Sequence, residues 1–298
     1  MRNIKTNISG SNHHTTEAEQ SSYRQIFRAT SLFGGVQAFN VIFGIIRVKV
    51  VAVLLGATGV GIIGLLNAPL QLIITATSLG ISMSAVREIA EANSSGNLLR
   101  ISDTLTAVKR WAWFTGLFGA LVTLLLAPFL SKWSFSSQEY TWAFVFLSLS
   151  VLFQSISKGQ GAKIQGMRKL KYIAVSNVMG TALSLAVSIL LYFYYGIKGI
   201  VPSLIITALI VLIISTSFSN KIKIPKSFQS PRESFFFGFG MVKLGLFMTL
   251  SSIVANASAY ILNAYISKKG GVEQVGLYNA GWNLAVQYTG LIFSAMAT

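Results

Sequence analysis

Long apolar stretches without Asp, Glu, Lys or Arg recur along the chain, and they constrain its fold more than any other feature. A membrane core of about 30 Å needs a helix of about 20 apolar residues to cross it. We therefore predict an all-α polytopic membrane protein with about eight spans, the first of them interrupted only by Arg47 and Lys49. The spans are 29–55, 60–86, 111–130, 140–157, 172–197, 199–220, 244–267 and 274–298.

Charge content supports the same class of protein. Only 11% of the residues are charged, whereas a soluble domain has about 25%. A membrane β-barrel would instead show short segments of alternating polarity. The chain has no cysteine, which rules out disulfides and thiolate metal sites. His13 and His14 lie in a polar N-terminal segment, and we predict no metal or cofactor there.

The basic residues are distributed unevenly between the connections. Eighteen of the 24 Lys and Arg residues lie before the first span or in 87–110, 158–171 and 220–243. The positive-inside rule then predicts a cytoplasmic N-terminus in the cell (inner) membrane. These segments would contact anionic membrane lipids, so the net charge of +16 requires no nucleic-acid partner. The other six Lys and Arg residues lie outside these segments and are Arg47, Lys49, Lys132, Lys198, Lys268 and Lys269.

Gly59, Gly61 and Gly64 match the pattern G-x-G-x-x-G. A dinucleotide site would also need an acidic residue about 20 positions further on, after an amphipathic helix. The following stretch is uncharged, and Glu88 lies beyond its end. We therefore interpret these glycines as positions for a tight turn and close helix packing.

No arrangement of acidic residues predicts an enzyme. Glu88 and Glu91 are spaced as a pair, but a solvated helix face with local ion pairs explains them better than catalysis. We therefore predict a protein that is not an enzyme. All the acids lie outside the predicted spans: Glu17, Glu19, Glu88, Glu91, Asp103, Glu139, Glu233 and Glu273.

Polar residues inside four spans recur at helical spacing, so that each row occupies one helix face. Such rows either join helices through amide hydrogen bonds or line a water-accessible cavity. Because four rows occur, we favour the cavity, and predict substrate contacts from Gln37, Asn40, Asn67, Gln71, Asn256 and Asn263. The rows are Gln37, Asn40, Gly44 and Arg47; Asn67, Gln71, Thr75, Ser78 and Ser82; Ser252, Asn256 and Asn263; and Asn279, Asn283 and Gln287.

Arg47 is the most informative single residue. A guanidinium keeps its proton in proteins, so inside a membrane it must be paired, hydrated or extended to the interface. No acid inside the spans can pair with it. It either binds an anionic ligand such as a phosphate or extends to the outer interface, as we expect for Lys49.

A weak internal repeat suggests two related units. Val60 and Gly61 open the second span much as Val275 and Gly276 open the eighth, each after a Gly-containing turn and a span with a polar row. Transporters often contain such repeats, with the substrate site between the halves. We predict a flexible polar arm over 1–26, a six-helix lobe over 27–220, a cytoplasmic loop over 221–243, and the first two helices of a second, truncated lobe over 244–298.

The N-terminal region resembles that of polysaccharide-exporting flippases. The similarity rests on GATGVGIIGLL at 56–66 and on its echo VGLYNAGWNL at 275–284. These flippases are the O-antigen translocases of the multidrug/oligosaccharidyl-lipid/polysaccharide exporter superfamily. The resemblance implies two six-helix lobes around a central cavity. It also implies movement of undecaprenyl-diphosphate-linked oligosaccharide, as in lipopolysaccharide assembly, by alternating access, with Arg47 attracting the diphosphate and with other glycan-assembly proteins as partners.

Three other functions are alternatives to this one. A cation-coupled multidrug antiporter of the same superfamily would need an acid inside the membrane, and the predicted spans contain none. A membrane-embedded glycan polymerase or glycosyltransferase would need a catalytic acid and a large outer loop. A membrane scaffold without transport activity is the third alternative.

Overall fold

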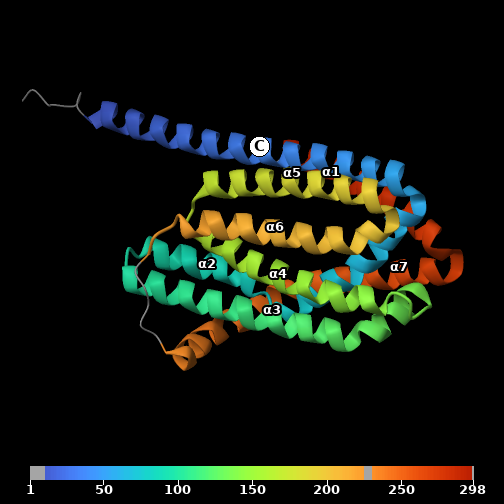
Figure 1. Ribbon diagram of the computed structural model, residues 1–298. Coiled ribbons are helices and arrows are strands. Elements are labelled where there is room, and N and C mark those ends of the chain that lie inside the picture. The colour runs from blue at the N-terminus through green and yellow to red at the C-terminus, as the bar shows by residue number, and fades with distance from the viewer. Residues whose placement is uncertain (1–10, 225–229, 297–298) are drawn as a thin grey trace, which may run out of the picture.

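The computed structural model describes residues 11–224 and 230–296. The regular structure in these residues is helical throughout, which confirms the predicted all-α polytopic membrane class. Figure 1 shows the long helices lying roughly parallel in one bundle. In order, they are α1 (Ser11–Thr77), α2 (Ile81–Ser94), α3 (Leu98–Phe135), α4 (Thr141–Gly166), α5 (Leu170–Tyr195), the 3₁₀ turn η1 (Gly196–Gly199), α6 (Ile200–Asn220) and α7 (Pro231–Met296).

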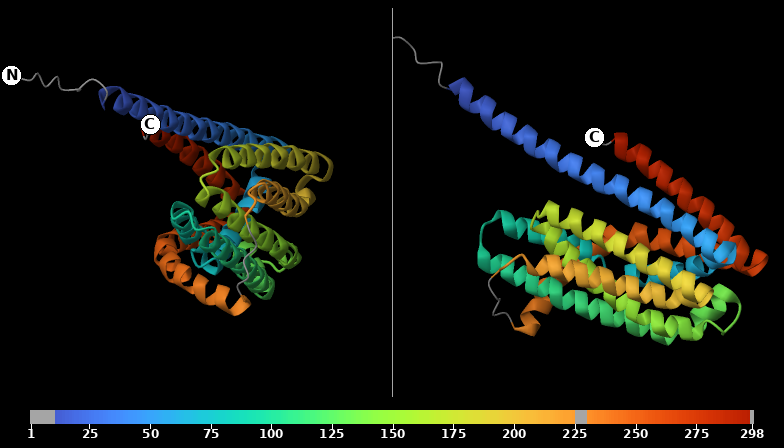
Figure 2. Two further views of the ribbon diagram at one scale, coloured as in Figure 1. Left: turned by 90° about the vertical axis from the view of Figure 1, so that its left-hand side faces the viewer. Right: turned by 45° about the horizontal axis from the view of Figure 1, so that its top comes forward.

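The two longest helices are each broken at a single glycine. In α1 the break is at Gly56, with φ 67° and ψ −173°, and in α7 it is at Gly271, with φ 81° and ψ 175°. Only glycine adopts this backbone region readily. Each break divides its helix into a first arm and a second arm. Figure 2 shows the first arm of α1 and the second arm of α7 together on one side of the bundle.

Five helical stretches of the described residues are long and apolar enough to cross a membrane. Three of them join two predicted spans, at Gly56, at η1 and at Gly271. The predicted number of about eight separate crossings stays a prediction. The stretches are Ala38–Thr77, Leu98–Phe135, Thr141–Gly166, Leu170–Asn220 and Gly245–Val286.

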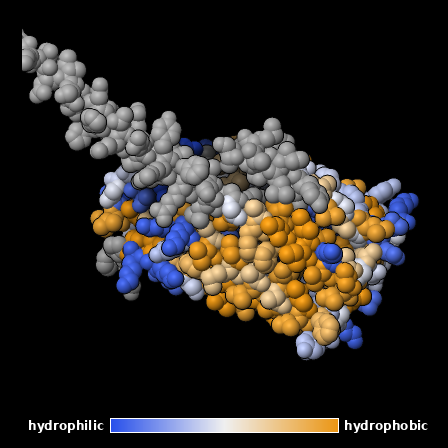
Figure 3. Space-filling view, turned by 90° about the horizontal axis from the view of Figure 1, so that it is seen from above, coloured by the Kyte–Doolittle hydropathy of each residue, from blue (hydrophilic) through white to orange (hydrophobic). Residues whose placement is uncertain are grey.

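Successive connections lie at opposite ends of the bundle. The α2–α3 turn, the α4–α5 turn, the end of α6 and the start of α7 lie at one end, which we call the basic end (Figure 1). The break at Gly56, the α3–α4 loop, η1 and the break at Gly271 lie at the other end. Figure 3 shows an apolar band between hydrophilic residues at the two ends. This arrangement suits a multi-pass membrane protein, because only the ends reach water.

Helices extend into regions that the sequence predicted as arm or loop. α1 begins at Ser11, inside the predicted flexible arm, and 11–33 contains neither Gly nor Pro to interrupt a helix. α7 begins at Pro231, inside the predicted loop 221–243; proline suits the first helical position, where no N–H partner is needed. α3 begins at Leu98, where the Asn97 side chain accepts hydrogen bonds from the N–H groups of Leu99 (3.0 Å) and Arg100 (3.2 Å).

The core lies where the second arm of α1 meets α3, α4 and α6. Leu66, Phe144 and Leu147 are fully buried there, together with Ile200. Many large apolar side chains on the outside are exposed instead, among them Leu125 on α3. An apolar exterior around a packed interior is what a lipid environment requires.

The two broken helices cross each other at a pair of glycines. A Cβ on Gly61 would overlap the carbonyl oxygen of Val272, and a Cβ on Gly276 would overlap that of Ala57. The two contacts are reciprocal, because Ala57 and Val272 each directly follow the broken residue of their own helix. Gly61 and Gly276 are also the glycines that occupy matching positions in the weak internal repeat of the sequence. Of the G-x-G-x-x-G glycines, Gly61 and Gly64 allow the close helix packing that was predicted, because a Cβ on either would overlap α7 at Val272 or Asn279.

Candidate functional site

A cavity of about 770 Å³ lies between the two arms of α1 and helices α4, α5 and α6. Ten of its lining side chains are polar and neutral: five carry hydroxyls and five carry amides. We call it the hydroxyl-rich cavity. The hydroxyls are Ser150, Ser176, Thr181, Ser184 and Thr207, and the amides are Asn40, Asn67, Gln71, Gln154 and Asn177.

A second cavity, of about 430 Å³, lies between α1 and α7. We call it the amide cavity, because its polar lining consists of side-chain amides and Arg47. Its α7 wall carries residues from both arms of that helix. The amides are Asn67, Gln71, Asn256, Asn263, Asn279 and Asn283.

Four residues of α1 line both cavities. Gly44 and Arg47 come from its first arm, and Asn67 and Gln71 come from its second arm. Arg47 is the only charged side chain among the described residues that line either cavity. The two polar spaces therefore meet at a single guanidinium.

Arg47 lies well inside an apolar stretch. It precedes the break at Gly56 by nine residues, which is about 14 Å along the helix axis and roughly half the thickness of a membrane core. Its side chain is exposed, and no ion pair or hydrogen bond joins it to another described residue. A charge at this depth needs water or an anion as a partner, and the guanidinium can bind a phosphate through two parallel hydrogen bonds.

The amides around Arg47 are organised by hydrogen bonds. Gln71 Nε2 donates to Gln154 Oε1 at 3.2 Å, and Gln154 Nε2 donates to Ser150 Oγ at 3.0 Å. This chain joins the second arm of α1 to α4 across the hydroxyl-rich cavity. Ser184 adds a buried hydroxyl oxygen that makes no hydrogen bond to the described residues. These amides and hydroxyls keep donors and acceptors that are free to bind the polar groups of a ligand.

The amide cavity has its own hydrogen bonds across helices. Asn256 Nδ2 donates to Thr75 Oγ1 at 3.1 Å, which joins α7 to α1. Asn279 Nδ2 donates to Asn263 Oδ1 at 2.8 Å, which joins the two arms of α7. Some of the predicted polar residues thus also act as contacts between helices, which is the role that such rows have when they do not line a cavity.

Six of the seven predicted substrate residues line one or both cavities: Arg47, Asn40, Asn67, Gln71, Asn256 and Asn263. The side chain of Gln37 lies outside the described residues, as does that of Gln287. Ser78 and Ser252 line neither cavity; the hydroxyl of Ser78 donates to the Thr75 carbonyl at 3.0 Å. Lys49 is exposed and lines neither cavity.

The polar residues of α4, α5 and α6 were not predicted. On α5, Asn177, Thr181 and Ser184 follow one another at helical spacing, and on α4 Ser150 and Gln154 do the same. These rows are visible in the sequence by the periodicity that identified the other four. They consist mainly of hydroxyls, whereas the predicted rows were recognised by their amides.

The lining of the two cavities combines one cation with neutral hydrogen-bonding groups. No Asp or Glu occurs among the described lining residues of either cavity, and the described residues contain no group of His, Asp or Glu that could hold a metal ion. One cation and many neutral donors and acceptors can hold a ligand that is anionic at one point and rich in hydroxyls elsewhere.

The comparisons with known proteins agree with this geometry. The model of a family described as "Polysaccharide biosynthesis protein" matches residues 26–298. A solved structure of a multidrug resistance MATE family transporter of the MOP superfamily, in its inward-facing conformation, is similar with a TM-score of 0.66 and 14% sequence identity. The match covers 88% of this chain and 61% of that chain, so the chain spans less than two thirds of the transporter's length.

No curated protein sequence matches the chain. The structural similarity establishes that the chain shares the fold of this transporter, and the two six-helix lobes that the resemblance in sequence implied stay a prediction. The family model covers most of the chain and includes both helix breaks, at Gly56 and at Gly271. The chain belongs to the polysaccharide biosynthesis protein family.

Proposed function

We propose that the protein is a flippase that moves undecaprenyl-diphosphate-linked oligosaccharide, such as an O-antigen repeat unit, across the cytoplasmic membrane. Membership in the polysaccharide biosynthesis family and the exporter fold support a transport role. The finer assignment of the substrate rests on the chemistry of the two cavities.

One observation carries the proposal: a single guanidinium lies where two neutral polar cavities meet, deep inside an apolar bundle. A lipid-linked oligosaccharide has a diphosphate between a hydrocarbon tail and a polar glycan. Arg47 would bind the diphosphate, the amides and hydroxyls would bind the glycan, and the tail would stay in the bilayer. The two cavities together supply space for more than one sugar.

Alternating access would move the glycan by opening the polar space first to one face of the membrane and then to the other. The contact between α1 and α7 at the Gly61–Gly276 crossing lies near the end of the bundle opposite the basic end. We assign the basic end to the cytoplasm by the positive-inside rule. A close crossing at the far end then suits a state in which substrate enters from the cytoplasmic side. The predicted lobes, 27–220 and 244–298, would rock about this crossing.

The remaining assignments follow from this proposal. The N-terminus would lie in the cytoplasm, and membrane lipids and other glycan-assembly proteins would be partners. A cation-coupled multidrug antiporter is less well supported, because such a protein needs a carboxylate for the coupling ion and the cationic drug. The described lining of both cavities contains none.

Replacement of Arg47 tests the proposal. In cells that depend on this gene for a surface polysaccharide, Arg47→Ala should lower export roughly tenfold or more, because a hydrogen bond to a charged group contributes about 1.5–3 kcal/mol. Arg47→Lys should retain part of the activity, since it keeps the charge but loses bidentate binding. Lys49→Ala is the matched control, because Lys49 lies on the same arm and lines neither cavity.

Protein abundance in the membrane must be measured for each variant, so that loss of folding is separated from loss of transport. If the Arg47→Ala strain makes normal surface glycan and has a normal amount of the protein in its membrane, the guanidinium has no role in transport. Equal losses in Arg47→Ala and Lys49→Ala would show a general effect of charge on this arm.

A further inference from the structure

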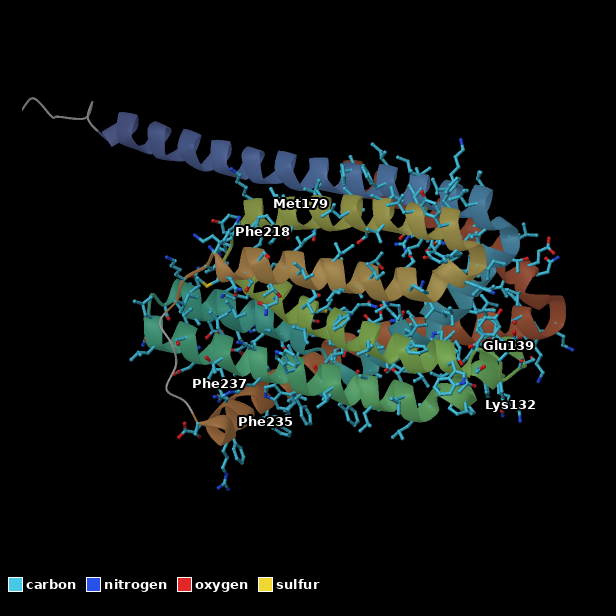
Figure 4. The ribbon with its side chains drawn as sticks, viewed as in Figure 1. Lys132, Glu139, Met179, Phe218, Phe235 and Phe237 are labelled. Atoms are coloured by element: carbon cyan, nitrogen blue, oxygen red, sulfur yellow. The ribbon has the colours of Figure 1, made fainter. Side chains whose placement is uncertain are left out.

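A third cavity, of about 830 Å³, lies at the basic end and shares no residue with the two cavities around Arg47. It is bounded by α3, α4, the segment that follows α6 and the first turns of α7. We call it the basic cleft. Figure 4 shows Phe235, which lines the cleft, at the same end of the bundle as Phe218 and far from Lys132.

Three cationic side chains line the basic cleft: Lys109 and Arg110 from α3, and Lys163 from α4. Lys163 Nζ donates to the carbonyl oxygens of Ser219 (3.0 Å) and Ile222 (3.3 Å), which are neutral partners. Lys109 is exposed and has no ion pair among the described residues. Two ammonium charges without a carboxylate partner therefore face one cavity, and an anion between them would relieve their repulsion.

No acidic residue lines the cleft among the described residues. Asp103 is on α3, but it is not part of the lining. Glu233, near the start of α7, accepts a hydrogen bond from the Ser230 N–H at 2.9 Å and also lies outside the lining. The chemistry of the cleft therefore favours an anionic ligand.

An apolar surface continues from the mouth of the cleft along α3. Trp113 lines the cleft and is also exposed, and Leu117 and Leu121 follow it at intervals of one helical turn, both exposed. This row lies within an apolar stretch that is long enough to cross a membrane. A ligand with a phosphate in the cleft could therefore lay a hydrocarbon chain along α3.

We propose that the basic cleft binds the headgroup of an anionic phospholipid from the surrounding leaflet, with the phosphate between Lys109 and Lys163 and an acyl chain against Trp113. Basic pockets between membrane helices on the cytoplasmic side are known to bind such headgroups, and a tryptophan at this level suits the interface. A free anion would gain nothing from the apolar row, so the surface favours a lipid.

The bound lipid would join parts of the chain that are far apart in sequence. The guanidinium of Arg110 donates to the Ser230 carbonyl at 2.8 Å and to the Ser234 hydroxyl, which attaches the start of α7 to α3. Phe235 in the same turn of α7 contacts Trp111, with ring centroids 4.7 Å apart. A headgroup in this cleft would therefore lie beside Ile222 and Ile224, which follow α6, and beside Phe235 near the start of α7.

Fluorescence quenching on the purified chain in a non-ionic detergent tests the proposal. The probes are phosphatidylglycerol and phosphatidylcholine, each with brominated acyl chains that quench tryptophan on contact. Phosphatidylglycerol should quench at a lower mole fraction, and Trp113→Phe should remove this difference. Lys109→Gln should raise the phosphatidylglycerol concentration for half-quenching about fivefold, since a lysine near an anionic surface contributes about 1 kcal/mol.

Lys132→Gln is the matched control, because Lys132 is an exposed lysine near the other end of the same helix. It should leave the half-quenching concentration unchanged. Lys109 is preferred to Lys163 for substitution, because Lys163 also binds backbone carbonyls and its loss could disturb folding. Equal quenching by the two lipids, or equal shifts in Lys109→Gln and Lys132→Gln, would overturn the proposal. Competition by inorganic phosphate at the same phosphorus concentration would show a free-anion site instead.

Discussion

The crossing of the two broken helices predicts a large difference between two glycine substitutions that lie five residues apart in α7. A Cβ on Gly276 would overlap the carbonyl oxygen of Ala57, a backbone atom that cannot rotate away. A Cβ on Gly281 would meet no atom within 4 Å. Gly276→Ala must therefore push α7 away from α1, whereas Gly281→Ala adds a methyl group to open space.

The expected energies have opposite signs. Overpacking of a close contact costs about 1–3 kcal/mol, and alanine at an unhindered helical position gains about 0.5–1 kcal/mol over glycine. The two variants should therefore differ by about 2 kcal/mol or more, which corresponds to roughly 4–8 °C in the midpoint of thermal unfolding. Gly276→Ala should be the less stable of the two.

Unfolding in detergent, followed by the fraction of protein that stays monodisperse after heating, measures this difference. Gly61→Ala should behave like Gly276→Ala, because its Cβ would overlap the carbonyl oxygen of Val272 on the other side of the same crossing. The double variant should lose less stability than the two single variants lose together, because one separation of the helices relieves both contacts. Equal midpoints for Gly276→Ala and Gly281→Ala would refute the crossing, and full additivity would refute the reciprocity.

Two further predictions concern the site and the topology. Gln154→Leu should lower export of the polysaccharide without loss of protein from the membrane, because it removes the partner of Gln71 (3.2 Å) and of Ser150 (3.0 Å) from the hydroxyl-rich cavity; normal export would exclude this wall from substrate binding. Cysteines at Lys169 and Lys268, both exposed, should react with a membrane-impermeant thiol reagent from opposite faces of the membrane; labelling from the same face would contradict the proposed topology.

Hydropathy predicted the apolar parts of the helices but not their ends. A helix that leaves the membrane keeps its backbone hydrogen bonds while its side chains become polar, so hydropathy marks membrane depth rather than helix length. α3 begins at Leu98, where Asn97 caps it, although the apolar stretch begins only at Trp111. The Asn97 cap was a signal in the sequence that hydropathy alone does not register.

The amide rows were predicted more readily than the hydroxyl rows because amides are costly to leave unpaired in an apolar helix. A serine or threonine can satisfy its hydroxyl by bonding to a carbonyl one turn back in its own helix. Ser188 does so with Ser184 (2.7 Å), and Thr115 does so with Trp111 (2.9 Å). A hydroxyl in a span is therefore weak evidence for a cavity, and only the three-dimensional packing distinguishes the lining residues from the others.

The polar rows on the two arms of a broken helix line the same cavity wall only if the helix breaks at a suitable position. Arg47 lies nine residues before Gly56 and Asn67 lies eleven after it, so the two are about 14 and 17 Å from the break along their arms. Asn40 lies sixteen residues before Gly56 and Gln71 lies fifteen residues after it. They are again at nearly the same distance from the break, about 24 and 23 Å along their arms. Folding at Gly56 therefore brings the rows of both arms to the same two levels.

The same reasoning applies to α7. Asn263 and Asn279 lie eight residues before and after Gly271, each about 12 Å from the break, and they form a hydrogen bond of 2.8 Å between the two arms. One glycine conformation, used once in each broken helix, thus sets the level at which the polar side chains of its two arms meet. Insertion of a single alanine between Gly56 and Asn67 would rotate the following residues by about 100° and turn Asn67 and Gln71 away from Arg47. The position of each break relative to the polar rows, rather than the number of polar residues, therefore determines whether they can line a shared cavity.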